Sequence, residues 1–260
     1  MATGIWLTLL SDAGEPVKKL MSMFKTYGIG ADGHVWENDL EKAAWIKARA
    51  NLLDKKISMW AIFGTDEELS DPEIRYGLSL LSMTVTAQKG QSFPIIVIQN
   101  GGKDPINPES LPTSLRHAQV LQASNAALGA KITAKIHTPS KKIFPEYRLD
   151  AFGHAQTGQW IEIGPCEGTW KGAMLGIDEG EISFHAVGPE GRLPERSVLE
   201  YPVKGIELAT GDRKYTAWAV ANELDTENSY YVQIKGCPKS LIFGAYTADE
   251  EAELYTLMLK

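Results

Sequence analysis

The first residues that could do chemistry are three glycines, Gly28, Gly30 and Gly33, in the stretch YGIGADGHVWEND. Their G-x-G-x-x-G spacing is that of a loop whose backbone cradles the pyrophosphate of a dinucleotide. Such a loop must follow a strand and open a helix, so that the helix N-terminus meets the phosphates. Here an amphipathic segment precedes the glycines and a short apolar segment follows them. We therefore expect Gly28 to end a helix in the left-handed conformation, and Gly30 and Gly33 to shape a turn.

Carboxylates and aromatic side chains form a second candidate site. Asp66 opens an acidic run, 66–68, directly after the apolar stretch 57–63. This position suits an acid that binds a ribose or a metal ion, and the alternative is a solvated loop surface. Trp36 and Trp45 are large enough to stack on a base. We expect Trp45 to pack within a helix face and Trp36 to be the exposed one of the two.

The other chemistry-bearing residue types give no recognisable constellation. The five histidines lack metal-ligand spacing and no Ser/His/Asp set stands out, so the sequence predicts no metal site. Cys166 and Cys237 lack C-x-x-C spacing. This favours a reducing compartment and a cytoplasmic location, although a single bridge between the two cysteines stays open.

Charge and hydropathy argue against two classes of partner. The formal net charge is −7, and it is uneven: up to Lys142 there are 16 Lys/Arg against 14 Asp/Glu, and after it 10 against 19. An acidic second half disfavours nucleic-acid binding, which needs Lys and Arg for the phosphates. No apolar run reaches the roughly 18–20 residues that span a bilayer. The opening stretch MATGIWLTLLSDAGE lacks a basic n-region, so we expect no secretion signal and no membrane partner.

The elements that must position these residues alternate in the first half of the chain. Apolar stretches predict strands at 5–10, 34–36, 57–63, 93–99 and 115–122. Helical periodicity and capping residues predict helices at 11–28, 39–56, 71–90 and 125–136. In the third of these, Asp71 is the expected N-cap and Pro72 the first helical residue. The alternation predicts a parallel sheet covered on both faces, with ligands at the carboxyl ends of its strands.

The order of these elements carries a family resemblance. The first strand ends in Ser11-Asp12, and GHVWENDLEKAAWI reads as a second strand and the loop after it. ISMWAIFGTDEELSDPEIRYGLSLL reads as a central strand, a polar loop and a helix, and FPIIVIQNG and SLPTSLRHAQVL as a fourth strand, a Pro-containing loop and an edge strand. In these features residues 5–137, about half of the chain, resemble a TIR-like domain of the flavodoxin-like class.

The resemblance implies a degenerate site. Catalytic members of that family cleave the N-glycosidic bond of NAD with a Glu on the third helix, in an S-x-x-W-C-x-x-E-L pattern. The matching stretch here runs from Ser70 to Leu78, and Gly77 stands at the position of that Glu. A glycine supplies no acid, base or charge, so the resemblance points to the adaptor and scaffold members of the family.

Glu73 keeps an enzymatic interpretation open. It lies one helical turn before Gly77, and Gly64-Thr65 with Asp71-Pro72-Glu73 resembles the G-T-x-x-E-x-G-like setting of the nucleophilic Glu in nucleoside deoxyribosyltransferases. A carboxylate near an anomeric carbon stabilises or attacks an oxocarbenium-like state. The expected ligand-binding residues around it are Ser11, Asp12, Trp36, Gly64 and Asp66. The alternative for Glu73 is structural, because an acid in the first turn complements the helix dipole.

The second half is rich in short strand candidates separated by turn residues, at 158–164, 170–177, 181–188, 204–210, 215–223, 229–236 and 240–246. They predict an antiparallel barrel or sandwich. The final stretch predicts a C-terminal helix capped by Thr247. We expect an α/β domain at 1–138, a linker at 139–152 and a β-rich domain at 153–260. Of the adjacent Tyr230 and Tyr231, we expect one to face outward.

Three functions follow. The first is a cytoplasmic recognition or self-assembly protein without a cofactor, of a bacterial signalling or defence type as the resemblance implies, whose β domain binds a protein partner or ligand. The second is an enzyme that cleaves the N-glycosidic bond of NAD or a nucleoside with Glu73. The third is a sensor that binds a nucleotide without cleaving it.

Overall fold

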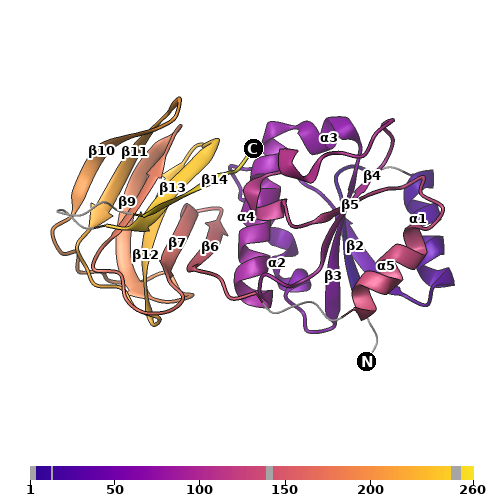
Figure 1. Ribbon diagram of the computed structural model, residues 1–260, viewed down its shortest axis with the longest axis horizontal. Coiled ribbons are helices and arrows are strands. Elements are labelled where there is room, and N and C mark those ends of the chain that lie inside the picture. Colours follow the sequence, from indigo (N-terminus) through magenta and orange to yellow (C-terminus); the bar gives the residue numbers. More distant parts are fainter. Residues whose placement is uncertain (1–3, 13, 139–142, 247–252) are drawn as a thin grey trace. The chain divides into compact units, whose positions relative to one another are not determined.

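The computed structural model describes residues 4–12, 14–138, 143–246 and 253–260 (Figure 1). The chain divides into two compact units, one made of residues 1–40 and 44–143 and the other of residues 41–43 and 144–260. Among the described residues, no helix is long and apolar enough to cross a membrane.

The first unit is built on a parallel five-stranded sheet. Its strands are β1 (Gly4–Leu9), β2 (Gly30–Val35), β3 (Ile57–Gly64), β4 (Ile95–Gln99) and β5 (Gln119–Gln122). They lie in the order β2-β1-β3-β4-β5, and every neighbouring pair is parallel. This is the order of the flavodoxin-like doubly wound sheets. The predicted α/β class with a parallel sheet is confirmed.

Helices cover both faces of this sheet (Figure 1). They are α1 (Glu15–Thr26), α2 (Arg49–Leu52), α3 (Asp66–Ser70), α4 (Pro72–Lys89) and α5 (Leu128–His137), with 3-10 turns η1 (Ala44–Ala48), η2 (Pro108–Ser110) and η3 (Thr113–Leu115). On one face, Phe24 of α1 and Ile132 of α5 pack against Met59 of β3 in the main apolar core. Helix α4 covers the other face, where the amide groups of Glu73 and Ile74 bond to the N-cap Asp71, as predicted.

The glycine-rich stretch is a helix end followed by a strand. Gly28 follows α1 with a φ of 68°, which confirms its predicted role. Gly30 and Gly33 lie in β2 and do not form a turn. A Cβ atom on Gly33 would lie 2.2 Å from the carbonyl oxygen of Leu7, so the close pairing of β2 with β1 requires glycine there. No helix begins after these glycines, and the stretch is not a phosphate cradle.

The helix predicted over 39–56 is much shorter in the structure. Only η1 and α2 are helical in this region, and Ala43 precedes them with a φ of 50°. Left-handed backbone at a non-glycine residue interrupts any continuous helix. The helical spacing of Leu40, Ala43, Ile46, Ala50 and Leu53 predicted one buried face, yet only Ala43 of these is buried and Ala50 is exposed. The periodicity was therefore wrong about the length of the helix and about part of its buried face, whereas Trp45 is buried as expected.

The second unit is an antiparallel β sandwich. Its strands are β6 (Tyr147–His154), β7 (Gly158–Pro165), β8 (Ala173–Ile177), β9 (Glu181–Pro189), β10 (Val203–Thr210), β11 (Arg213–Val220), β12 (Asn228–Lys235), β13 (Ser240–Ala245) and β14 (Leu254–Met258). One sheet has the order β10-β11-β8-β13-β14 and the other β6-β7-β12-β9. The predicted antiparallel β architecture is confirmed.

Two expectations for this half were wrong. Residues 254–258 form strand β14 paired with β13, where the sequence predicted a C-terminal helix; the expected cap, Thr247, lies outside the described residues. Residues 147–152 were assigned to a linker, and they lie in β6, which pairs with β7 along its whole length. Backbone pairing with a neighbouring strand overrides the weak local preference in both places.

Aromatic side chains fill the sandwich. Tyr230 and Tyr231 are both fully buried, so neither faces outward as expected. Tyr230 shares a 2.9 Å hydrogen bond with Nδ1 of the buried His185, whose ring also packs edge-on against Trp218. Burial, reinforced by the nearby charge of Lys204, lowers the pKa of His185 from 6.5 to about 4.

Candidate functional site

The site predicted by the fold lies at the carboxyl end of the parallel sheet, where β1 is flanked by β2 on one side and β3 on the other. In open α/β sheets the strand order reverses at such a point, and ligands bind in the crevice outside it. The chain leaves β1 through Ser11 and Asp12 and leaves β3 through Thr65 and Asp66. Four candidate residues predicted from the sequence lie at these two strand ends: Ser11, Asp12, Gly64 and Asp66.

Gly64 ends β3 because a side chain has no room there. A Cβ atom on Gly64 would lie 2.5 Å from Cδ1 of Leu10, which is buried, and 3.2 Å from Oε2 of Glu68. The backbone amide of Leu10 also donates a 2.9 Å hydrogen bond to Phe63. Leu10 therefore fills the space beside Gly64, and packing alone accounts for glycine at this position.

Glu68 links the ends of β1 and β3. It closes a capping box at the start of α3, accepting a 2.8 Å hydrogen bond from the amide of Thr65, while the amide of Glu68 donates to Oγ1 of Thr65. The hydroxyl of Ser11 also bonds to the Glu68 carboxylate. Burial on its own raises the pKa of Glu68, but the bonds from Ser11 and Thr65 outweigh it and lower the pKa. Glu68 is thus held as a carboxylate between the two strand ends.

Asp66 is tied to the next strand, β4. Its Oδ1 accepts a 2.6 Å hydrogen bond from Nε2 of the fully buried Gln99. The Gln99 side chain also donates to the carbonyl of Asp104 and accepts a 3.0 Å bond from the amide of Ile106. Gly102, with a φ of 78°, lies against the side chains of Asp66 and Gln99, since a Cβ atom there would be 2.3 Å from Nε2 of Gln99. Asp66 and Gln99 therefore organise the loop that follows β4.

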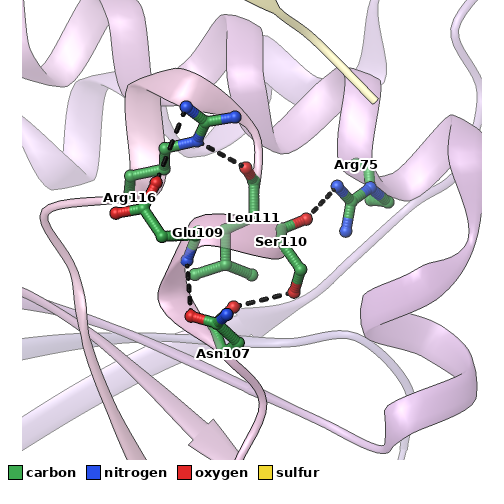
Figure 2. Close-up of polar contacts among 6 residues, drawn as sticks. All are labelled: Arg75, Asn107, Glu109, Ser110, Leu111 and Arg116. Carbon is green, nitrogen blue, oxygen red and sulfur yellow. Dashed lines mark hydrogen bonds and ion pairs between the residues drawn. The ribbon is translucent and has the colours of Figure 1, made fainter.

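The rest of the β4–β5 loop is held by arginines (Figure 2). Arg75 of α4 donates to the carbonyl oxygens of Leu69 and Ser110. Arg116 donates to the carbonyl of Leu111 and lies 3.7 Å from the carboxylate of Glu109. Burial lowers the pKa of the Arg75 guanidinium. These bonds fix the loop against the first half of α4, beside the candidate site.

Trp36 follows β2 and differs from its expected state. It was expected to be exposed, yet its side chain is only 7% exposed. Its indole fills the space in front of Gly77 on α4, where a Cβ atom would lie 2.7 Å from Cζ2 of Trp36 and 3.4 Å from Cβ of Trp45. The indole nitrogens of Trp36 and Trp45 are both buried without a hydrogen-bond partner among the described residues.

Glu73 is exposed in the first turn of α4. Its Oε2 accepts a 2.9 Å hydrogen bond from Nδ2 of Asn38, in the loop after β2. The contact joins the β2 loop to the start of α4, two segments that the fold brings together at the carboxyl end of the sheet. Asp12 is also exposed, and its carboxylate accepts a 3.4 Å hydrogen bond from the amide of Gly14.

The structure thus connects Ser11, Gly64 and Asp66 through the ends of β1 and β3, and it adds residues that the sequence reading missed. Glu68 was predicted only as part of the acidic run that could bind a ribose or a metal ion, and Asn38 and Gln99 were not singled out. A polar residue closing the apolar run IIVIQ was the available signal for Gln99. Among the described residues, no group of three or more His, Cys, Asp or Glu could hold a metal ion. Neither Cys166 nor Cys237 forms a disulfide bond among the described residues.

Comparisons with known proteins do not assign this chain to a family. No protein-family model matches the chain, and no curated protein matches it. Among solved structures, a two-domain esterase active on acetylated mannans covers 98% of this chain and 90% of its own, with 9% identity and a TM-score of 0.32. The same esterase co-crystallised with mannopentaose gives 9% identity and a TM-score of 0.31, covering 99% and 91%. At this level of similarity the match carries no information about activity.

Proposed function

We propose that this chain is a recognition and assembly protein whose α/β unit is a TIR-like scaffold without N-glycosidic activity. The observation that carries the proposal is the contact of Trp36 with Gly77. An acidic side chain at position 77 would have to displace a buried indole 2.7 Å from its first carbon atom. The place where the family resemblance implies a catalytic Glu is therefore occupied by a tryptophan ring.

Two further observations support a binding role. The loops at the carboxyl end of the sheet are closed by bonds within the protein, from Gln99 to Asp66 and from Arg75 to Ser110. Loops held in this way can bind a partner without first changing conformation, which lowers the entropic cost of binding. The sandwich adds exposed apolar side chains, Val198 and Tyr201 foremost. We also propose a reducing, cytoplasmic location, which the presence of only two cysteines without C-x-x-C spacing supports.

A second candidate function is cleavage of an N-glycosidic bond by Glu73. The bond from Asn38 favours it, because it orients an exposed carboxylate at the carboxyl end of the sheet. A third is nucleotide sensing without cleavage. The unpartnered indole N–H groups of Trp36 and Trp45 favour it, since acceptor atoms of a ligand would satisfy them.

The experiment is product analysis by mass spectrometry after incubation of the purified protein with NAD and a panel of nucleosides and nucleotides. Glu73→Gln is the test variant, and Glu15→Gln is the matched control, because Glu15 is an exposed acid in the first turn of another helix, α1. The proposal expects no free base from any of the three proteins. Free base that disappears only in Glu73→Gln would overturn it in favour of the enzyme. Saturable nucleotide binding without turnover would establish the sensor instead.

A further inference from the structure

One connection of the sandwich folds back over the sheet that it leaves. We call residues 190–197 (EGRLPERS), which follow β9, the strap. At its start, the amide of Glu190 donates a 2.7 Å hydrogen bond to the carbonyl of Glu227, the residue before β12. Further along, Pro194 lies so close to β9 that a Cβ atom on Gly188 would be 2.4 Å from Cβ of Pro194. The strap therefore lies against β9 and the start of β12.

The strap contacts two polar side chains, Glu162 of β7 and Tyr231 of β12. The two residues pair directly across these strands and so lie on the same face of the sheet. The neighbouring Tyr230 bonds to His185, whose ring packs against Trp218 of the other sheet, so Tyr230 points into the sandwich and Tyr231 points away from it. Glu162 is nevertheless only 2% exposed, and Tyr231 is fully buried. An outward-facing carboxyl group is thus kept from water.

Backbone groups of the strap bond to both of these side chains. The amide of Gly191 donates a 2.9 Å hydrogen bond to Oε1 of Glu162, and the amide of Arg192 donates a 3.2 Å bond to Oη of Tyr231. Oη of Tyr231 also bonds to the carbonyl of Pro189 and lies 3.0 Å from Oε1 of Glu162. The strap is therefore held closed through the Glu162–Tyr231 pair.

The number of protons at this pair indicates the ionisation state of Glu162. Oη of Tyr231 has two oxygen neighbours, the Pro189 carbonyl and Oε1 of Glu162, but it carries a single proton. When Glu162 is protonated, Tyr231 donates to Pro189 and accepts from Glu162 and from the amide of Arg192, so each group has a partner. When Glu162 is ionised, two acceptors compete for one proton. One buried oxygen is then left without a donor, which destabilises the closed strap.

Nearby carboxylates also favour the protonated state. Asp150 of β6 pairs with Glu162 in the β6–β7 ladder, and its negative charge disfavours a second one on Glu162. In the strap, Glu190 adds a negative charge close to Tyr231, whose pKa is raised by burial and by the charges of Glu162 and Glu190. The Arg192 side chain is exposed, so that residue contributes its amide to this contact.

Two groups act in the opposite direction. The hydroxyl of Ser229 on β12 bonds to Glu162, and Arg148 of β6 donates a 2.9 Å bond to this same hydroxyl. These contacts and the bonds from Gly191 and Tyr231 favour the carboxylate, but burial outweighs them. The pKa of Glu162 is therefore raised above its ordinary value of 4.5, chiefly by burial.

We propose that a protonated Glu162 holds the strap closed over the β6-β7-β12-β9 sheet and that the strap opens when this carboxyl group ionises. Opening uncovers the outward face of the sheet around Tyr231. That face continues to the exposed Phe184 of β9, which pairs with Gln233, two residues beyond Tyr231. The sandwich thus contains a pH-sensitive switch. This inference goes beyond the proposed function and does not rest on it.

The direction of the pH dependence follows from the two states of the strap. In the open state Glu162 meets water and has the ordinary pKa of 4.5, whereas in the closed state its pKa is higher. Closure is therefore strongest below pH 4.5 and weakens as the pH rises. The equilibrium constant for opening should increase about tenfold per pH unit until the pH passes the raised pKa of the closed state.

Amide hydrogen exchange followed by mass spectrometry, from about pH 5 to about pH 8, tests the proposal. The rates are corrected for the intrinsic dependence of exchange on pH, so that protection measures the opening of the strap. Peptides that contain Gly191 and Arg192 should lose protection about tenfold or more over this range, because their amides are released from Glu162 and Tyr231. Constant protection of these peptides would overturn the proposal.

Two variants assign the effect to the buried carboxyl group. Glu162→Gln removes the titrating group, so the protection of the strap should no longer depend on pH. Glu195→Gln is the matched control, because Glu195 is an exposed acid of the strap itself, and this variant should behave like the natural chain. A pH dependence that persists in Glu162→Gln, or that disappears in Glu195→Gln, would refute the role of Glu162.

A measurement on the natural chain decides the matter if Glu162→Gln folds poorly. The NMR signal of the Glu162 carboxyl carbon, followed as a function of pH, reports the ionisation of this group directly. It should titrate above pH 4.5, together with the loss of protection in the strap. Titration at or below pH 4.5 would overturn the proposal.

Discussion

Gly77→Ala is the substitution that tests the packing beneath the candidate site. In an open helix interior, alanine stabilises a protein by about 1 kcal/mol relative to glycine. Here the new methyl group would lie 2.7 Å from Cζ2 of Trp36, well inside the roughly 3.5–4.0 Å that carbon atoms prefer. Overpacking of this kind costs about 1–3 kcal/mol. The two together predict a net loss of up to roughly 2 kcal/mol in place of the usual gain.

Gly129→Ala in α5 is the matched control. A methyl group there would approach the ring of Tyr27 even more closely, at 2.3 Å, but Tyr27 is 44% exposed where Trp36 is 7% exposed, so we expect the tyrosine ring to move aside at a lower cost. We expect this variant to be no less stable than the natural chain, by up to about 1 kcal/mol in its favour. Urea unfolding followed by circular dichroism measures both variants.

A double-mutant cycle assigns the cost to the tryptophan. Trp36→Leu removes the ring that the Gly77→Ala methyl group meets, so the combined variant should be more stable than the sum of the two losses by about 1 kcal/mol or more. If Gly77→Ala instead stabilises the protein as in an open helix, Trp36 does not block the position. The steric argument against a catalytic carboxylate on α4 would then fail.

Three further outcomes can be checked separately. As the pH falls from 6.5 to about 4, His185 binds a proton in the unfolded chain but stays neutral in the folded one. The free energy of unfolding of the sandwich should therefore fall by on the order of 1–2 kcal/mol after allowance for solvent screening. Thermal melts that show the same dependence on pH in His185→Gln would contradict this. Gln99→Leu should cost roughly 1–3 kcal/mol in a urea titration, since the amide of Ile106 loses its acceptor, and an unchanged midpoint would count against that anchor. Asp71→Ala should cost about 1 kcal/mol and Asp71→Asn much less, because asparagine also caps a helix; equal losses in the two variants would mean that the capping hydrogen bonds do not account for the stabilisation.

The sequence predicted most of the α/β unit because local and tertiary signals agree there. The run FPIIVI is apolar throughout, and its second part begins the fully buried strand β4. Helix α4 has an Asp71 cap, a first-turn proline and a glycine after its last residue, and its bounds were predicted within a residue or so. Capping chemistry is encoded in a few neighbouring residues, so one sequence is enough to read it.

The predictions were wrong where the structure or burial of a segment depends on residues far away in the sequence. Residues 254–258 (LYTLM) suit either a helix or a strand, and pairing with β13 decides the matter. The exposure of Trp36 could not be read locally, because it depends on the absence of a side chain at Gly77 on another element. The bond between Glu68 and Ser11 joins segments that only the parallel sheet brings together. Spacing within one segment carries none of this information.

The order of strands in the five-stranded sheet of the sandwich also sets how this unit is made. Strand β8 is the first of that sheet to be synthesised, yet both of its partners, β11 and β13, come later in the chain. Its pairing is nonlocal on both edges, which makes folding slow. Until β11 and β13 have been synthesised, both backbone edges of the apolar strand β8 lack a pairing partner, and other nascent chains can pair with them. We therefore expect β8 to be the strand of this sheet that is most exposed to incorrect pairing during synthesis.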